Sequence, residues 1–171
     1  IFATTSLQAV PLEAIAGSMT DHFDPRSNIV RLSDPVRSQP SIASMAIAAH
    51  ELGHVQQYQT GSAMIKARGF LVPAVQFSPR VSYICLLLGF WFNLTGLLWL
   101  GIIFFGIMVI FSILTIPVEF DASRRGLQLL EQAGLMRTEA DRKGAKSILT
   151  AAGMTYLAAA VTSILQLLYY I

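Results

Sequence analysis

Two of the three histidines in this chain lie four residues apart, and a glutamate directly follows the first of them. These residues are His50, Glu51 and His54, in the stretch AHELGHVQQ. Positions i and i+4 of a helix share one face, so both imidazole rings can bind one tetrahedral metal ion. This spacing is the helical zinc arrangement in which the glutamate is the general base. We therefore predict that His50 and His54 bind Zn²⁺ and that Glu51 is catalytic.

Glu51 lies about 100° around the helix from His50, so it can reach a water molecule at the metal without binding the metal itself. The alternative is that the two histidines only pack within the protein, with Glu51 at the surface. This alternative is the weaker one, because buried histidine and glutamate side chains need polar partners in any case.

The third metal ligand has to come from elsewhere in the chain. A catalytic zinc needs three protein ligands and one open position. No histidine follows the pair at a useful distance, so a carboxylate is required. Glu119, in the stretch IPVEFDASRRG, is the first candidate and Asp121 is the rival. An acid at position 119 would also suit the first turn of a helix beginning after Pro117, where the helix dipole favours negative charge.

The distribution of charge predicts a membrane protein. Hydrophobic residues make up 54% of the chain, more than in an ordinary soluble domain. Every Asp, Glu, Lys and Arg lies in 1–80 or 119–146, which leaves 81–118 and 147–171 without charge. A membrane span needs about 20 apolar residues. The tract 147–171 therefore predicts one transmembrane helix, and 81–118 predicts a transmembrane helical hairpin that turns at Asn93.

The expected fold is a mainly α membrane protein with a small β-hairpin and zincin-like helices. Four regions follow: 1–80 with the β-hairpin and the His-Glu-x-x-His helix, 81–118 as the transmembrane hairpin, 119–146 as a polar helix carrying the third ligand, and 147–171 as the C-terminal transmembrane helix. The strands of this β-hairpin, or β-meander, are expected within 7–16 and 28–32, with Asp24 and Pro25 in the turn.

The helical segments have recognisable ends. The histidine helix is expected over 41–59, capped by Ser38 or Ser41. The next helix is expected to be interrupted at Pro73 and Pro79, because proline removes a backbone hydrogen bond. A separate polar helix is expected over about 118–133, after Pro117.

Charge and cysteine content narrow the possible partners. The net charge of +2 is too small to indicate a nucleic-acid partner, whereas the lipid bilayer is a required one. Basic residues flank the hairpin on both sides, which favours the cytoplasmic side for these flanks. The single Cys85 forms no disulfide within the chain. The sequence starts at Ile1 without signal-peptide features, so we expect an upstream segment to be missing.

Three separate stretches together resemble a known family. AAHELGHVQQ (48–57), TDHFDPRSNIVRLS (20–33) and PVEFDASRRG (117–126) look like the membrane-anchored neutral zinc metallopeptidases of bacteria, also called zinc peptidase type 2. The resemblance covers nearly the whole chain. More distantly, the chain is similar to HtpX proteases and CAAX prenyl endopeptidases, which also place a membrane hairpin between the histidine motif and a glutamate ligand.

The resemblance implies a function and a set of residue roles. Zn²⁺ would be held by His50, His54 and Glu119, with Glu51 as the base of a gluzincin-type peptidase. The expected substrates are peptides or proteins, including membrane proteins. The expected location is the bacterial plasma membrane, crossed several times, with the active site on the cytoplasmic side. The family's N-terminal membrane helix is absent from this sequence.

The chain departs from its distant kin at one position. They usually carry an aspartate four residues after the glutamate ligand, where this chain has Ser123. We therefore expect Asp121 or Ser123 to orient a histidine. An additional donor is expected to stabilise the developing oxyanion. The candidates for this donor are His22, Tyr156, Arg124 and Arg125.

Two other hypotheses compete with a peptidase whose active site lies at the membrane face. The first is a non-catalytic, zinc-stabilised membrane scaffold or chaperone-like protein, which would need the metal but not Glu51. The second is a protease whose metal site lies inside the bilayer. The polar stretch QQYQTGS follows the histidine motif at once, which disfavours this second reading.

Overall fold

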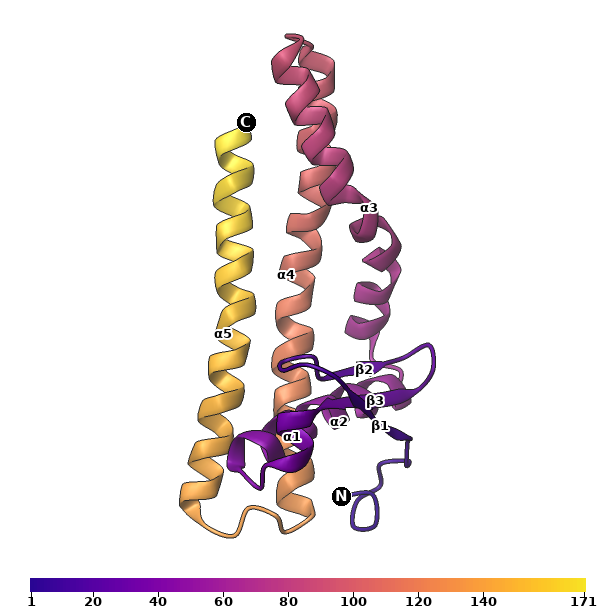
Figure 1. Cartoon of the computed structure of the whole chain (residues 1–171), viewed down its shortest axis with the longest axis vertical. Helices are drawn as coiled ribbons and strands as arrows, with labels where there is room; N and C mark the ends of the chain where they lie inside the picture. Colours follow the sequence, from indigo (N-terminus) through magenta and orange to yellow (C-terminus); the bar gives the residue numbers. More distant parts are fainter. The chain divides into compact units, whose positions relative to one another are not determined.

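A computed structural model describes all 171 residues, and 71% of them are helical. A small three-stranded sheet accompanies the helices, which confirms the prediction of a mainly helical membrane protein (Figure 1). In chain order the elements are β1 (Leu12–Ile15), β2 (His22–Asp24), β3 (Ile29–Ser33), α1 (Asp34–Ser38), α2 (Ile42–Gln59), α3 (Ala63–Trp91), α4 (Thr95–Gln132) and α5 (Glu139–Tyr170).

The chain divides into two compact units. The first contains Ile1–Ser62 and Val118–Met154, and the second contains Ala63–Pro117 and Thr155–Ile171. Helices α4 and α5 therefore contribute residues to both units. The sheet, α1 and α2 belong entirely to the first unit, whereas α3 belongs entirely to the second.

The sheet has the strand order β1-β3-β2, so β3 is its central strand. The strand β1 pairs in parallel with β3, and β2 pairs antiparallel with β3. Strands are present in both predicted stretches, as β1 within 7–16 and β3 over most of 28–32, but they pair in parallel and are not the two arms of one hairpin. The actual hairpin joins β2 to β3 through a turn that includes Pro25 and Asn28, whose φ is 56°. The three residues of β2 are too few to show the alternating pattern by which a strand is recognised.

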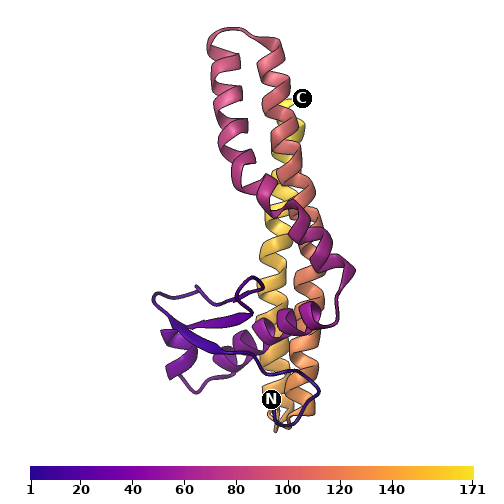
Figure 2. The same ribbon diagram turned by 90° about the vertical axis from the view of Figure 1, so that its right-hand side faces the viewer.

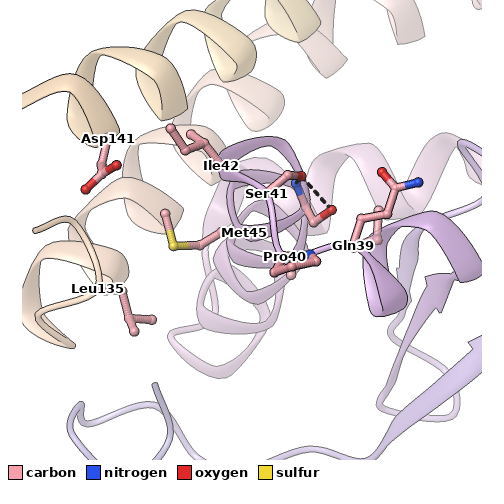
Figure 3. A pocket seen from close by; sticks show the side chains of 10 residues that line it. Gln39, Pro40, Ser41, Ile42, Met45, Leu135 and Asp141 are labelled. Atoms are coloured by element: carbon pink, nitrogen blue, oxygen red, sulfur yellow. Dashed lines mark hydrogen bonds between the residues drawn. The ribbon is translucent and has the colours of Figure 1, made fainter. Parts of the chain in front are cut away.

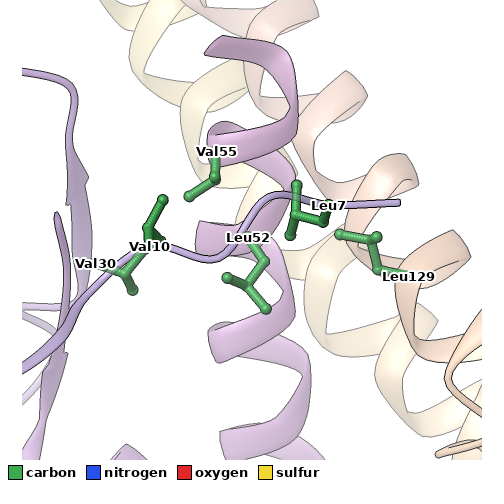
Figure 4. Packing of buried hydrophobic residues seen from close by; sticks show 6 residues of the cluster. All are labelled: Leu7, Val10, Val30, Leu52, Val55 and Leu129. Atoms are coloured by element: carbon green, nitrogen blue, oxygen red, sulfur yellow. The ribbon is translucent and has the colours of Figure 1, made fainter. Parts of the chain in front are cut away.

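Helix α2 begins where the sequence predicts. The Ser41 side chain accepts a hydrogen bond from the backbone N–H of Ser44, as an N-cap residue does. Gly61, with φ of 65°, follows the end of the helix. The sheet lies against α2 (Figures 1 and 2), and an apolar cluster joins side chains of α2 to others from the N-terminal segment, β3 and α4. The buried members of this cluster are Leu7, Val10, Val30, Leu52, Val55 and Leu129 (Figure 4).

Two glycines let the backbones of α2 and α4 approach closely. A Cβ added to Gly53 of α2 would lie 2.1 Å from the carbonyl oxygen of Ala122 in α4. A Cβ added to Gly126 of α4 would lie 2.6 Å from the carbonyl oxygen of Ala49 in α2. Neither space can hold a methyl group, because both neighbours are backbone atoms. These contacts hold the histidine helix against the turns of α4 that begin at Val118.

In the second unit, α3 and α4 form an antiparallel hairpin (Figure 2). Asn93 makes its turn with φ of 54°, as the sequence indicates. The two helices touch where Gly89 faces Leu98 and Gly101 faces Leu86. The buried Ser82 hydroxyl also donates to the carbonyl oxygen of Gly101 at 2.8 Å. Small residues at such contacts let membrane helices pack closely.

Prolines do not end the helices as predicted. Pro73 and Pro79 lie inside α3, and Pro117 lies inside α4. The expected interruptions of α3 and the expected new helix at 118 were therefore wrong. An apolar segment gains from keeping its remaining backbone hydrogen bonds within the helix, so continuation is favoured despite the one bond that each proline removes.

Three helices are long and apolar enough to cross a membrane: α3, α4 and α5. They account for the two arms of the predicted hairpin and for the predicted C-terminal span. Many of their large apolar side chains are exposed, as the side chains of a lipid-facing helix are.

Candidate metal centre

Three potential ligands from two helices converge in the first unit. Helix α2 supplies His50 and His54, whose rings lie one helical turn apart, and α4 supplies Glu119. The Glu119 Oε2 atom is 3.2 Å from Nε2 of His50 and 3.5 Å from Nε2 of His54. The ligand atoms of all three residues lie within 4.8 Å of one another. Glu119 is only 2% exposed, so its carboxylate is enclosed with the two rings.

These spacings fit a zinc ion. Zinc binds histidine nitrogen and carboxylate oxygen at about 2.0–2.2 Å, which puts neighbouring donor atoms of a tetrahedron about 3.4 Å apart. The two oxygen–nitrogen distances to Glu119 are close to that value. Two imidazoles and one carboxylate are also a ligand set of catalytic zinc sites, in which the fourth position stays open. The residues present therefore fit the metal.

The other ring nitrogen of each histidine has a polar partner. Nδ1 of His50 is 3.1 Å from the Ser123 hydroxyl, and Nδ1 of His54 is 3.0 Å from Oε1 of Gln57. Both rings thus direct Nε2 towards Glu119. Hydrogen bonds of this kind fix the orientation of a metal-binding imidazole and determine which nitrogen is free for the metal.

Glu51 lies between the histidine helix and the sheet. Its side chain is buried, and its Oε2 accepts a 2.9 Å hydrogen bond from the backbone N–H of Phe23 in β2. Burial raises the pKa of the Glu51 carboxyl, and the charge of Glu119 adds to this effect, although His54, His50 and the Phe23 amide oppose it. A raised carboxyl pKa is typical of catalytic bases in enclosed sites.

The His54 imidazole has a raised pKa. Burial alone would lower the pKa, but the hydrogen bond and charge of Glu119 outweigh burial, with smaller contributions from Glu51 and Gln57. The site therefore holds two acidic side chains around the histidines. A cation bound among them would be favoured by this excess of negative charge.

Asp121 lies one step further from the histidines. Its carboxylate accepts a hydrogen bond from the Gln57 side chain and pairs with Arg124 and Arg125. Arg125 also reaches the side chain of Gln56 on α2. Asp121 thus contacts His54 only through Gln57, whereas Ser123 bonds directly to His50.

The remaining predicted site residues are distributed over both units. His22 precedes Phe23 in β2, and its Nδ1 is 2.8 Å from the carbonyl oxygen of Thr20. Because a carbonyl only accepts hydrogen bonds, Nδ1 of His22 carries the proton in this contact. Tyr156 belongs to the second unit.

Two contacts of the site were not predicted from the sequence. Gln57 could have been found from its spacing, because it lies three residues after His54 on the same helix. The Phe23 amide has no signal in the sequence, since any residue except proline would supply the same N–H group.

One hollow in the first unit lies away from these side chains. It has a volume of about 470 Å³ and covers the first turns of α2 (Figure 3). Its lining includes Gln39, Pro40, Ser41, Ile42, Met45 and Asp141. None of the three convergent ligands lines it, so its size carries no information about the metal centre.

Comparison with known proteins agrees with the geometry. Residues 1–171 match the family described as "Putative neutral zinc metallopeptidase". The protein named "Putative membrane protease YugP" of Bacillus subtilis (strain 168) is 37% identical over 171 residues, which are 100% of this chain and 76% of that protein. No solved structure gives a significant match. Since the family match spans every residue, the chain belongs to the neutral zinc metallopeptidases.

Proposed function

We propose that the protein is a zinc-dependent endopeptidase of the gluzincin type that cleaves peptide bonds at the cytoplasmic face of the bacterial plasma membrane. The single observation that supports this most is the position of Glu119. Its carboxylate oxygen lies 3.2 Å and 3.5 Å from Nε2 of two histidines that precede it by a whole membrane hairpin. The substrates would be peptides or proteins, including membrane proteins.

In the proposed reaction His50, His54 and Glu119 hold the metal. When bound, zinc acidifies a water molecule and polarises a carbonyl oxygen. Oε2 of Glu51 is held by the Phe23 amide, so Oε1 is the atom that takes the proton of the attacking water. A C–O bond forms at the peptide carbonyl. Glu51 then gives its proton to the departing nitrogen as the C–N bond breaks.

The free edge of β2 is the proposed place for an extended substrate. The strand β3 has neighbours on both sides, so it has no free edge for a substrate, whereas β2 lies at the edge of the sheet. The N–H of Phe23 points away from β3 towards Glu51. A peptide running along this edge would therefore pass beside the base, and main-chain hydrogen bonds would hold it there.

The cytoplasmic assignment is supported by the positions of basic residues. Helix α2 precedes the hairpin and the Glu119 turn follows it, so both lie on one side of a bilayer that the hairpin crosses twice. Cytoplasmic flanks of membrane helices carry an excess of Lys and Arg. The basic residues that follow the hairpin are Arg124, Arg125, Arg137, Arg142, Lys143 and Lys146.

Metal content and proteolysis of purified full-length variants test this function. We expect wild-type protein in detergent to hold about one zinc per chain and to cleave unfolded casein. The Glu51→Gln variant is expected to keep the zinc and to lose about 10²–10⁴-fold in cleavage rate, because only the base is removed. The Glu119→Ala variant is expected to lose the zinc.

Glu131→Ala is the matched control for position 119. Glu131 lies on the same helix and forms an exposed ion pair with Arg142 at 2.8 Å, so its loss should change neither zinc nor cleavage. Equal zinc in Glu119→Ala and wild type would remove Glu119 from the ligand set. Undiminished cleavage by Glu51→Gln would reject the catalytic assignment and favour the zinc-stabilised scaffold.

A further inference from the structure

The Gln57 side chain is the least exposed polar group beside the candidate metal centre. It is 0% exposed, and all three of its hydrogen bonds are short. Oε1 is 3.0 Å from Nδ1 of His54. The amide nitrogen Nε2 is 2.8 Å from the carbonyl oxygen of Val118 and 2.9 Å from Oδ2 of Asp121. Gln57 therefore connects a proposed ligand on α2 to two acceptors on α4.

The partners on α4 determine which way the amide of Gln57 points. A backbone carbonyl and an ionised carboxylate only accept hydrogen bonds. The NH₂ group of Gln57 must therefore face Val118 and Asp121, because the reverse orientation would set the amide oxygen against two other oxygens. Arg124 and Arg125 keep Asp121 ionised by pairing with its carboxylate.

The fixed amide in turn determines the proton position on His54. With its NH₂ group committed to α4, Gln57 presents only its oxygen to Nδ1, so Nδ1 must carry the hydrogen. A neutral imidazole has one N–H and one lone pair, so the lone pair is then on Nε2. Nε2 is the nitrogen that lies 3.5 Å from Glu119 Oε2.

We propose that Gln57 is a positioning residue that selects the metal-binding tautomer of His54 and holds its ring towards Glu119. The role rests on the proposed metal centre, but it is a separate property of that centre. It also makes Val118 and Asp121 part of the support of His54, because they orient the amide. Residues that support a metal ligand in this way typically change metal affinity about 10- to 100-fold when they are removed.

Zinc affinity of the full chain is the first measurement. Dissociation constants can be obtained by competition with a fluorescent zinc chelator, without any substrate. Gln57→Leu keeps the approximate volume but removes all three hydrogen bonds, and we expect about 10- to 100-fold weaker binding. The matched control is Gln59→Leu, on the same helix, since the Gln59 side chain bonds only to the backbone of Gln8. The control should keep wild-type affinity.

Exchanging the donor and the acceptor between positions 57 and 121 tests whether lost zinc affinity can be restored. Gln57→Glu keeps an acceptor for His54 but sets a carboxylate against Asp121, so zinc binding should weaken. Adding Asp121→Asn returns a donor, because the new amide can donate to the second oxygen of the carboxylate that Gln57→Glu introduces. We expect the double variant to recover most of the lost affinity. A general loss of packing would not be repaired by a second substitution.

The tautomer itself can be read in the metal-free protein at an alkaline pH, where the imidazole rings are neutral. With only three histidines, the ¹⁵N NMR signals of the rings can be assigned by single substitutions. Wild-type His54 should carry its proton on Nδ1, whereas Gln57→Leu should show a mixture of tautomers. Should that variant fail to fold, the zinc affinities of Gln57→Glu with and without Asp121→Asn test the proposal in its place, and a double variant no better than Gln57→Glu would reject it.

The outcomes separate this proposal from the proposed function. Absence of zinc binding by the wild type would reject the metal centre itself. Zinc binding by the wild type with equal affinity in folded Gln57→Leu would reject only the role of Gln57. An unchanged His54 tautomer in Gln57→Leu would also reject the role of Gln57.

Discussion

Phe23 contributes to the site through its backbone N–H, which holds Oε2 of Glu51 at 2.9 Å. Its ring packs edge-on against Tyr58, with ring centroids 5.8 Å apart. The two contributions can be separated by substitution, because alanine keeps the amide hydrogen and proline removes it. Proline is tolerated in an edge strand where the N–H is not used by the sheet.

We predict that Phe23→Pro lowers the cleavage rate about tenfold further than Phe23→Ala, because a hydrogen bond to a charged group is worth about 1.5–3 kcal/mol. Both variants lose the ring, so the contact with Tyr58 cancels in the comparison. The measurement is kcat on a peptide substrate, with zinc content and thermal stability recorded for both. Equal rates in two folded, zinc-loaded variants would show that the amide does not support Glu51.

Much of the local site was readable from the sequence because its signals are local. The i, i+4 spacing of His50 and His54 determines their common face, and Ser41 caps the helix that carries them. The partners of Gln57 were not readable, since Val118 and Asp121 are more than 60 residues away and no pattern within α2 points to them.

At the scale of the elements, the contact between α2 and α4 fixes how far apart these two helices lie. Gly53 faces the Ala122 carbonyl and Gly126 faces the Ala49 carbonyl, so the two backbones touch directly at both glycines. Glu119 lies on α4 one turn before Ala122. The separation of the helices therefore sets the distance between this carboxylate and the histidines.

We predict that Gly53→Ala separates the two helices and weakens zinc binding as well as the fold. The added methyl group would have to displace backbone at 2.1 Å, and such overpacking costs about 1–3 kcal/mol. The control is Gly106→Ala on α4, where an added Cβ meets nothing within 4 Å. Thermal unfolding and zinc affinity are the measurements. Wild-type values in Gly53→Ala would contradict the close contact.

The predictions that were wrong at this scale concerned the pairing of the strands and the ends of the helices. The sequence shows that apolar strands exist before the histidine helix, but parallel pairing of β1 with β3 depends on contacts outside both strands. The prolines of α3 and α4 were read with rules that hold in water, where a freed backbone carbonyl has solvent as an alternative partner. A helix in an apolar environment keeps its hydrogen bonds because it has no such alternative.

For the whole molecule, the two tryptophans report on how the hairpin sits in a bilayer. Trp91 ends α3 and Trp99 lies in the second turn of α4, on either side of the Asn93 turn. Both side chains are more than half exposed, so lipid can reach them. Tryptophan favours the boundary between the apolar core and the headgroups.

We predict that Trp91 lies near a headgroup layer and that Trp99 lies deeper in the bilayer. Trp99 is four residues beyond the start of α4, and a helix rises 1.5 Å per residue, so the difference in depth should be about 6 Å. Single-tryptophan variants, Trp99→Phe and Trp91→Phe, can be placed in vesicles that contain lipids brominated at different depths. Shallow bromines should quench Trp91 best. Stronger quenching of Trp91 by bromines at the bilayer centre would mean that the hairpin does not cross the membrane.

The order of the ligands along α2 and α4 has a consequence for biosynthesis. His50 and His54 leave the ribosome before the hairpin, whereas Glu119 is translated only after the hairpin has been made. A nascent chain therefore cannot complete the proposed three-ligand centre until both arms of the hairpin are available for insertion. The chain order alone would keep a newly made protease inactive during translation.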